Sequence, residues 1–216
     1  MEKNIVEKLN SLKNTPESLI LINPVEQIDL FLYENLINTL FYDLFEIYWL
    51  KCRENYTQEF IFNFLIDFLT IQNKGKITNG VNVVKLFITY FKKYKNKDIL
   101  SELFVQITKY IKYYDIIVNE KSRNDKINNL LHRINKMQNK EAYPYLMEVF
   151  EDYEYARINT DMLIEILNTV ILFINHQCDE QEDSIITNFN QLSKEINKML
   201  LLKVLTPKIV KVEVES

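Results

Sequence analysis

Apolar side chains recur at steps of three and four residues along most of the chain, which is typical of amphipathic helices. Over residues 26–50 these positions are Leu30, Tyr33, Ile37, Leu40, Phe41, Leu44 and Tyr48. A polar break at 51–56 follows. The pattern then resumes over 58–72 behind Thr57, which we expect to cap that helix. The next clear loop is 73–80, with the sequence NKGKITNG.

The same periodicity predicts six further helices, over 81–94, 98–118, 127–137, 144–155, 162–174 and 184–200. Ser122 with Asp125 resembles a capping box for the third of these. Pro144 fits the first turn of the fourth, where its missing N–H costs nothing. Thr160 and Asp183 are the expected caps of the last two.

These elements predict an all-α protein, an irregular bundle of about eight helices. We expect a helical lead-in over 1–24, one helical domain over 25–205 and a tail over 206–216. Within the tail, the alternation of IVKVEV after Pro207 is typical of a short strand, although no partner segment is evident.

Composition excludes several classes of enzyme. The chain has 216 residues and only two glycines, Gly75 and Gly80. Neither a dinucleotide-binding loop nor a P-loop can be built from this pair, because both need two or three glycines at fixed spacing. The glycine-flanked serine of a nucleophile elbow is excluded for the same reason.

Metal and redox sites are not expected either. Cys52 and Cys178 are far apart, as are His132 and His176, and the close pair His176 and Cys178 has nothing local to complete a zinc site. Two cysteines give no disulfide framework. The chain has no apolar run long enough to span a membrane, and MEKNIVEKLN lacks the apolar stretch of a signal peptide. We therefore expect a cytoplasmic protein without cofactors, metals or membrane contact.

The densest group of carboxylates lies in EVFEDYEYAR, with Glu148, Glu151, Asp152 and Glu154. General acid–base catalysis needs two carboxylates in a pocket with their pKa values moved apart. A solvated helix end explains this group more simply. No histidine is accompanied by a serine-bearing turn, so we predict that the chain is not an enzyme.

Charge is unevenly distributed. Residues 85–140 contain thirteen lysines and arginines and five acids, whereas residues 141–200 contain three and twelve. One interpretation is that facing helices neutralise each other across an internal seam. The other is a basic surface that binds phosphates or an acidic partner.

Aromatic residues alternate with lysines in the basic block. The candidate binding residues are Lys92, Lys93, Lys95, Lys109, Lys112, Tyr94 and Tyr113. Stacking rings combined with cations are what single-stranded nucleic acids require. Aromatic residues at helical spacing are also typical of a core, and the low pI of about 5.4 argues mildly against nucleic-acid binding.

One region resembles a known family. The residues that carry the likeness are Leu131, Ile134 and Asn135, then Tyr143, Pro144, Tyr145 and Leu146, then Asp152 and Tyr153, with Tyr48 and Trp49 upstream. Residues 45–200 are similar to the helical middle region of GmrSD-type modification-dependent restriction proteins. The family's nucleotide-hydrolysing and His-Asn-His nuclease motifs are missing here, and Asn175-His176 replaces its paired arginines. No catalytic residue is therefore carried over.

Two functions follow as expectations. The first is a non-catalytic interaction protein of antiviral defence that binds a protein or nucleic-acid partner. The second is an inhibitor from a phage or mobile element that blocks a defence nuclease of the restriction or CRISPR type. In both cases we expect a protein partner such as a nuclease, or the guide RNA that such a nuclease carries. The oligomeric state stays open.

Overall fold

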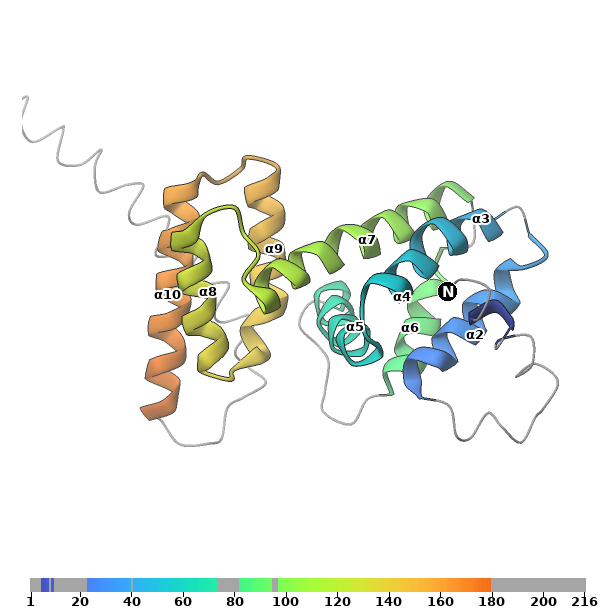
Figure 1. The fold of residues 1–216 in the computed structure, drawn as a ribbon, viewed down its shortest axis with the longest axis horizontal. Coiled ribbons are helices and arrows are strands. Elements are labelled where there is room, and N and C mark those ends of the chain that lie inside the picture. Colours follow the sequence, from blue (N-terminus) through green and yellow to red (C-terminus); the bar gives the residue numbers. More distant parts are fainter. Residues whose placement is uncertain are drawn as a thin grey trace, which may run out of the picture. The chain divides into compact units, whose positions relative to one another are not determined.

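The computed structural model describes residues 5–7, 9, 23–39, 41–73, 82–94 and 97–179, and every regular element in these ranges is a helix (Figure 1). The all-α prediction is therefore confirmed for the described part of the chain. The expected lead-in over 1–24 lies largely outside these ranges. The tail over 206–216 with its strand, and the helix expected after Asp183, lie wholly outside them.

Contacts within the chain divide it into two compact units, Met1–Tyr114 and Asp115–Ser216. The boundary lies within α7 (Lys97–Asn119), which begins in the first unit and ends in the second. One domain can contain two compact units, so the single domain expected over 25–205 stays a prediction.

The first unit is built around a layer of aromatic and aliphatic side chains. Its elements are α2 (Pro24–Leu36), α3 (Tyr42–Leu44), the π-helical turn η2 (Phe45–Leu50), α4 (Lys51–Asn55), α5 (Gln58–Gln72), α6 (Val83–Phe91) and the first part of α7. Helices α2, α5 and α6 contact one another. Trp49, Phe64 and Phe87 are fully buried among them, and burying a large side chain stabilises a fold by about 1.5–3 kcal/mol.

The sequence pattern predicted one helix over 26–50, and this was wrong, since α2 ends at Leu36 and α3 begins at Tyr42. Thr39 forms the turn between them. Its N–H and its hydroxyl both donate to the carbonyl of Leu36, at 2.9 and 2.8 Å, and its Oγ1 accepts from the N–H of Phe41. No glycine or proline occurs between residues 36 and 42, so the apolar spacing gave no sign of a break.

The polar break predicted at 51–56 was also misplaced. Helices α3, η2 and α4 follow one another directly, so the helix continues to Asn55. The chain leaves it at Tyr56, which has extended backbone angles. Thr57 then caps α5 as predicted, because its Oγ1 accepts from the N–H of Phe60 at 3.2 Å.

The second unit contains the end of α7, followed by α8 (Asp125–Lys136), the 3₁₀ turn η3 (Lys140–Ala142), α9 (Tyr143–Glu154) and α10 (Thr160–Asp179). Helix α10 contacts both α8 and α9 (Figure 1). The apolar faces of these helices are buried: Ile127, Leu130, Leu131 and Ile134 on α8, and Leu163, Leu167, Val170 and Ile171 on α10. The polar residues of α8 are therefore left on its outer side.

The start of α8 differs from the predicted capping box. Asn124, and not Ser122, is the capping residue, because its Oδ1 accepts from the N–H groups of Lys126 and Ile127. Ser122 lies two residues earlier, where its Oγ accepts from the N–H of Asn124. An asparagine caps a helix as well as a serine does, so the composition alone could not choose between them.

Helices α9 and α10 begin close to the predicted positions. Pro144 lies in the first turn of α9, as expected. The cap of α10 is Asn159 and not Thr160, since the Oδ1 of Asn159 accepts from the N–H of Met162 at 2.9 Å. Thr160 is the first residue of the helix, and its hydroxyl is hydrogen-bonded to that of Tyr153.

Candidate functional site

The lysine and tyrosine residues predicted to bind a partner lie in the first unit, at the end of α6 and on α7. Lys92, Lys93 and Lys112 are exposed, while Tyr94 and Lys109 are half-buried. We call these five residues the α6–α7 basic surface. Lys95, which was predicted with them, lies outside the described residues.

A row of aromatic rings connects two of these lysines. Phe68 on α5 packs edge-to-face against Tyr90 on α6, with ring centroids 5.9 Å apart, and against Tyr110 on α7, at 5.8 Å. The ammonium of Lys93 lies 5.7 Å from the ring centre of Tyr90, and that of Lys109 lies 5.3 Å from the ring centre of Tyr110. Both distances suit a cation–π interaction, so α6 and α7 each place a lysine beside the same aromatic row.

The tyrosine hydroxyls at this row are ordered by hydrogen bonds. The hydroxyl of Tyr90 donates to Oε1 of Gln72 at 2.8 Å and lies 2.6 Å from the hydroxyl of Tyr94. Because the single proton of Tyr90 goes to Gln72, Tyr94 is the donor between the two tyrosines. Burial, followed by the contact with Tyr94, raises the pKa of Tyr90 above its ordinary value. Burial therefore favours the neutral phenol of Tyr90, and its two hydrogen bonds connect the end of α6 to Gln72 and Tyr94.

Two of the predicted residues differ from what a binding surface requires. Tyr113 belongs to the aromatic row, because its ring packs edge-to-face against Tyr110 with centroids 5.6 Å apart. Tyr113 is only 4% exposed, so its ring does not offer a face on which a base could stack. Lys112 is exposed on the side of α7 near Cys52, where its charge acts on the pKa of that thiol. The aromatic part of the predicted surface thus reduces to Tyr94.

The two charge blocks meet through apolar faces wherever α8 contacts α10. Ion pairs between described residues in or beside the blocks include Lys121 with Asp115 at 3.1 Å, His132 with Glu120 at 3.0 Å and Arg157 with Asp152 at 2.7 Å. Each of these pairs joins residues that are close in the sequence. None of these pairs crosses from residues 85–140 to residues 141–200, and the internal seam stays a prediction.

A buried carboxylate lies elsewhere in the first unit. Asp29 on α2 is 2% exposed and accepts hydrogen bonds from Nε1 of Trp49 at 2.7 Å and from Nε of Arg53 at 3.0 and 3.1 Å. Burial raises the pKa of Asp29 above its ordinary value, and the Arg53 charge and the two hydrogen-bond donors oppose that rise. Trp49 lies in η2 and Arg53 in α4, so the carboxylate ties α2 to the long helix that contains the π turn.

The contacts of Asp29 with Trp49 and Arg53 are typical of a group that stabilises the fold. Among the described residues, no buried side-chain nitrogen or oxygen lacks a hydrogen-bond partner. The oxygens of Asp29 are taken up by Trp49 and Arg53, which leaves the carboxylate poorly placed to remove a proton from a ligand. We therefore assign Asp29 to the fold.

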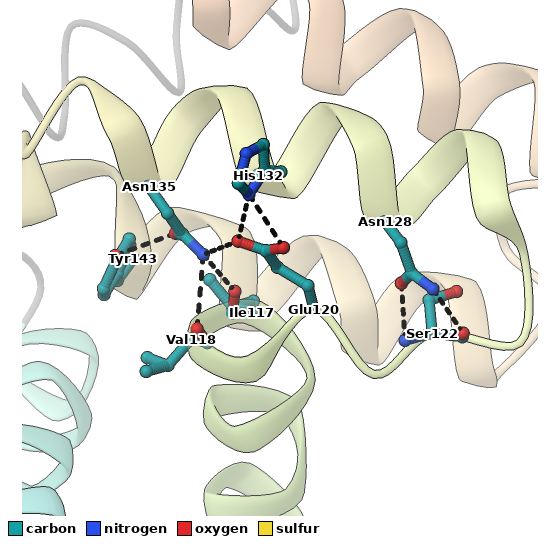
Figure 2. Close-up of polar contacts among 8 residues, drawn as sticks. All are labelled: Ile117, Val118, Glu120, Ser122, Asn128, His132, Asn135 and Tyr143. Carbon is teal, nitrogen blue, oxygen red and sulfur yellow. Dashed lines mark hydrogen bonds and ion pairs between the residues drawn. The ribbon is translucent and has the colours of Figure 1, made fainter.

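A second polar cluster joins the end of α7 to α8 in the second unit (Figure 2). The Nδ2 of Asn135 donates to the carbonyls of Ile117 and Val118, at 3.0 and 3.3 Å, and to Oε1 of Glu120 at 3.1 Å. Its Oδ1 accepts from the hydroxyl of Tyr143 at 2.9 Å. Asn135 thus satisfies carbonyls that the last turn of α7 leaves without an intrahelical partner.

Glu120 adopts a left-handed backbone conformation, with φ of 56°, directly after the last residue of α7. Glycine is the usual residue there, because a side chain raises the energy of this conformation. The Glu120 carboxylate is held by Asn135 and by Nδ1 of His132 (Figure 2). These contacts offset the backbone strain.

His132 beside the Glu120 carboxylate resembles the histidine–acid pair of a catalytic triad. The neighbouring Ser122 is not placed as the nucleophile of such a triad. Ser122 contacts α8 through Asn128: its N–H donates to Oδ1 of Asn128 at 2.7 Å, and its carbonyl accepts from Nδ2 of Asn128 at 2.9 Å (Figure 2). The Ser122 hydroxyl is used by Asn124. The contacts drawn here hold the α7–α8 connection and place no nucleophile on His132.

Three acidic residues of α9, Glu148, Glu151 and Asp152, are half-buried, and Glu154 at the helix end is exposed. Glu148 is half-buried, and burial raises its pKa, with Glu151 and Asp152 raising it further by repulsion. Asp152 accepts from Nη1 of Arg157 at 2.7 Å just past the helix end. In the part of the chain that the structure describes, no group of three or more potential ligands could hold a metal ion. Within the same residues, no helix has the length and apolarity needed to cross a membrane.

Comparison of the chain with protein-family models, curated proteins and solved structures found no match. The resemblance to GmrSD-type restriction proteins therefore stays a prediction. The residues that carried it have structural contacts: Asn135 binds Tyr143, Asp152 binds Arg157 and Tyr153 binds Thr160.

Asp29 and Glu120 were missed by reading the sequence, and Asn135 was named there only for the family resemblance and not for a polar contact. Asp29 gave one signal, since it is an acid between two apolar residues on a helix that is otherwise buried on that side. Glu120 and Asn135 form contacts between the end of α7 and α8. The spacing of residues along the sequence does not predict such contacts.

Proposed function

We propose that the chain is a non-catalytic helical protein of the cytoplasm that works by binding an anionic partner, either a nucleic acid or an acidic protein surface. One observation carries the proposal: Lys93, in the turn after α6, and Lys109, on α7, lie beside one aromatic row formed by Tyr90, Phe68 and Tyr110. A lysine held against a ring has fewer conformations to lose when it meets a phosphate or carboxylate.

The non-catalytic character is supported by the chemistry of the polar clusters. The carboxylate of Asp29 and that of Glu120 are both occupied by neighbouring side chains. The resemblance of residues 45–200 to the helical region of restriction proteins supports a role in antiviral defence, where nucleic acids and proteins that hold them are the partners.

The test compares a variant of the α6–α7 basic surface with a charge-matched control. The variant is Lys92→Glu with Lys93→Glu, and the control is Lys51→Glu with Lys85→Glu, which are exposed lysines outside that surface. Fluorescence anisotropy would measure the binding of labelled single-stranded RNA and of labelled polyglutamate. Differential scanning fluorimetry would give the Tm of each protein.

We expect the Lys92 and Lys93 variant to lose at least about tenfold in affinity at low salt, while the control stays close to wild type. The Tm should change little in both, because exposed charges contribute little to stability. Equal losses in the two variants, or no binding of either ligand by the wild-type protein, would contradict the proposal.

A further inference from the structure

Helix α8 in the second unit has a stripe of cations that the predicted site did not include. Lys126, Arg133 and Lys136 are all exposed, and Asn129 is exposed between them. At 100° per residue, the three cations fall within a sector of about 80° around the helix axis. Lys126 and Lys136 are separated by about 15 Å along that axis. We call these four residues the α8 stripe.

The α8 stripe is held firmly in place from behind. Ile127, Leu130, Leu131 and Ile134 are at most 8% exposed on the opposite side of the helix. Asn128 and Asn135 fix α8 to the connection from α7 (Figure 2). The apolar face is therefore used within the protein, which excludes the mode in which a basic amphipathic helix inserts its apolar face into a membrane.

Local structure does not explain all three cations. Arg133 and Lys136 are in the last turn of α8, where positive charge stabilises the helix dipole. Lys126 is in the first turn, where the dipole disfavours a cation. The ion pairs between described residues involve other side chains than these three. The nearest acids along the chain are Asp125, at the edge of the stripe, Glu120, which binds His132, and the exposed Glu141 beyond the end of α8.

The composition of the α8 stripe distinguishes between classes of partner. The exposed large apolar residues of the described chain are Ile47, Ile99, Val105, Tyr155 and Leu172, and none of them is on α8. Protein–protein interfaces are enriched in aromatic residues at their centre and depleted in lysine. Interfaces with nucleic acids are polar and strongly positive, and arginine, lysine and asparagine provide most contacts to the phosphates.

The absence of an exposed aromatic residue from α8 also bears on the kind of nucleic acid. Proteins that hold single strands stack bases on aromatic rings, whereas a duplex hides its bases and presents phosphates. A duplex carries one negative charge per about 1.7 Å of its axis, so the length of the stripe suffices for three phosphate contacts. We propose that the α8 stripe binds the sugar–phosphate backbone of a nucleic-acid duplex without reading its sequence.

This surface is separate from the one under the proposed function, since its residues belong to the second unit. The experiment uses the full chain and a labelled DNA duplex of random sequence, with binding measured by anisotropy at several salt concentrations. The variant is Lys126→Glu with Arg133→Glu. The matched control is Lys51→Glu with Lys85→Glu, which changes the net charge by the same amount.

For the wild-type protein, log Kd should rise linearly with log salt. Loss of two phosphate contacts should lower that slope by about 2 and weaken binding at low salt by about tenfold or more. The control should keep the wild-type slope, and duplexes of different sequence should bind alike. The Lys92 and Lys93 variant should also retain duplex binding, so the two surfaces can fail independently.

Several results would overturn this inference. These are the absence of duplex binding at low salt, an unchanged slope in the Lys126 and Arg133 variant, and the same loss in the control. A preference for phosphatidylserine vesicles or for polyglutamate over the duplex would assign the stripe to another partner. If circular dichroism shows that the reversal variant has lost helix, Lys126→Gln with Arg133→Gln removes the charges with less repulsion and decides the question.

Discussion

The carboxylate of Asp29 and the guanidinium of Arg53 form an ion pair at 3.0 Å, with side-chain exposures of only 2% and 7%. A buried ion pair of this kind adds little stability relative to a well-packed apolar pair, because folding removes both charges from water. Removing only one partner destabilises the fold, because the remaining charge is then left buried and unpaired. Trp49, which donates to the same carboxylate, would lose its acceptor as well.

The first prediction is that Asp29→Ala lowers the free energy of unfolding by about 3–5 kcal/mol, the usual effect of leaving one buried charge unpaired. Urea denaturation followed by circular dichroism measures this. Glu34→Ala is the matched control, since Glu34 is an exposed acid on the same helix. Replacing both partners, as Asp29→Leu with Arg53→Met, should cost less than Asp29→Ala alone. A double variant as unstable as the single one would show that the pair is not the cause.

The second prediction concerns Asn135, which satisfies two carbonyls of α7 and accepts from Tyr143. Asn135→Ala leaves several half-buried polar groups without this partner, and each unsatisfied group costs about 1–3 kcal/mol. We expect a clear loss of stability in urea denaturation. Asn129→Ala on the exposed side of the same helix is the control and should change stability by less than about 0.5 kcal/mol. Equal effects would mean that the hydrogen bonds drawn in Figure 2 contribute nothing to stability.

Apolar spacing and capping residues predicted most helices. They failed at two places in the first unit. Apolar spacing located α5 and α7, while Thr57 marked the start of α5 and Pro144 that of α9. It failed between α2 and α3, where Thr39 closes a turn that contains neither glycine nor proline. It also failed at 51–55, where polar residues continue a helix whose buried side includes Cys52. Hydrogen bonds within the turn close the chain at Thr39, whereas at 51–55 Arg53 contacts Asp29 on α2.

The candidate sites were predictable only in part. The exposure of Lys92 and Lys93 follows from their place at the end of an apolar helix. The burial of Tyr113 does not, because Tyr and Lys alternate there and either can border a core. The cations of the α8 stripe were visible in the sequence at helical spacing. Among the described residues the ion pairs named above involve other side chains, and this depends on tertiary contacts that helical spacing does not predict.

The third prediction uses the backbone of Ala156, which has φ of 54° just after α9. Glycine adopts this left-handed conformation without steric cost, whereas alanine does not. Ala156→Gly should therefore raise the free energy of unfolding by about 0.5–1 kcal/mol, since the relief of strain exceeds the extra freedom of the unfolded chain. Ala142→Gly is the control: Ala142 has helical angles, so glycine should destabilise there. Destabilisation by both substitutions would contradict the strain at Ala156.

The last prediction concerns Cys52, whose thiol is buried on α4. Burial raises its pKa from 9.0 to about 11, although a hydrogen bond with Thr108 and the charge of Lys112 oppose the rise. Only the thiolate reacts with a disulfide reagent, so at pH 8 the folded protein should react about a hundredfold more slowly than the same thiol in urea. Because the folded state holds this proton more tightly than the unfolded state, stability should also fall as the pH rises from about 9 to 11.

The measurement is the rate of reaction with Ellman's reagent in a Cys178→Ser background, which removes the other cysteine, together with urea denaturation at pH 8 and pH 10. Cys52→Ser in that background is the control for the pH dependence, and it should lose less stability between the two pH values. A thiol that reacts equally fast in the folded and unfolded protein would show that Cys52 is accessible and ionises normally.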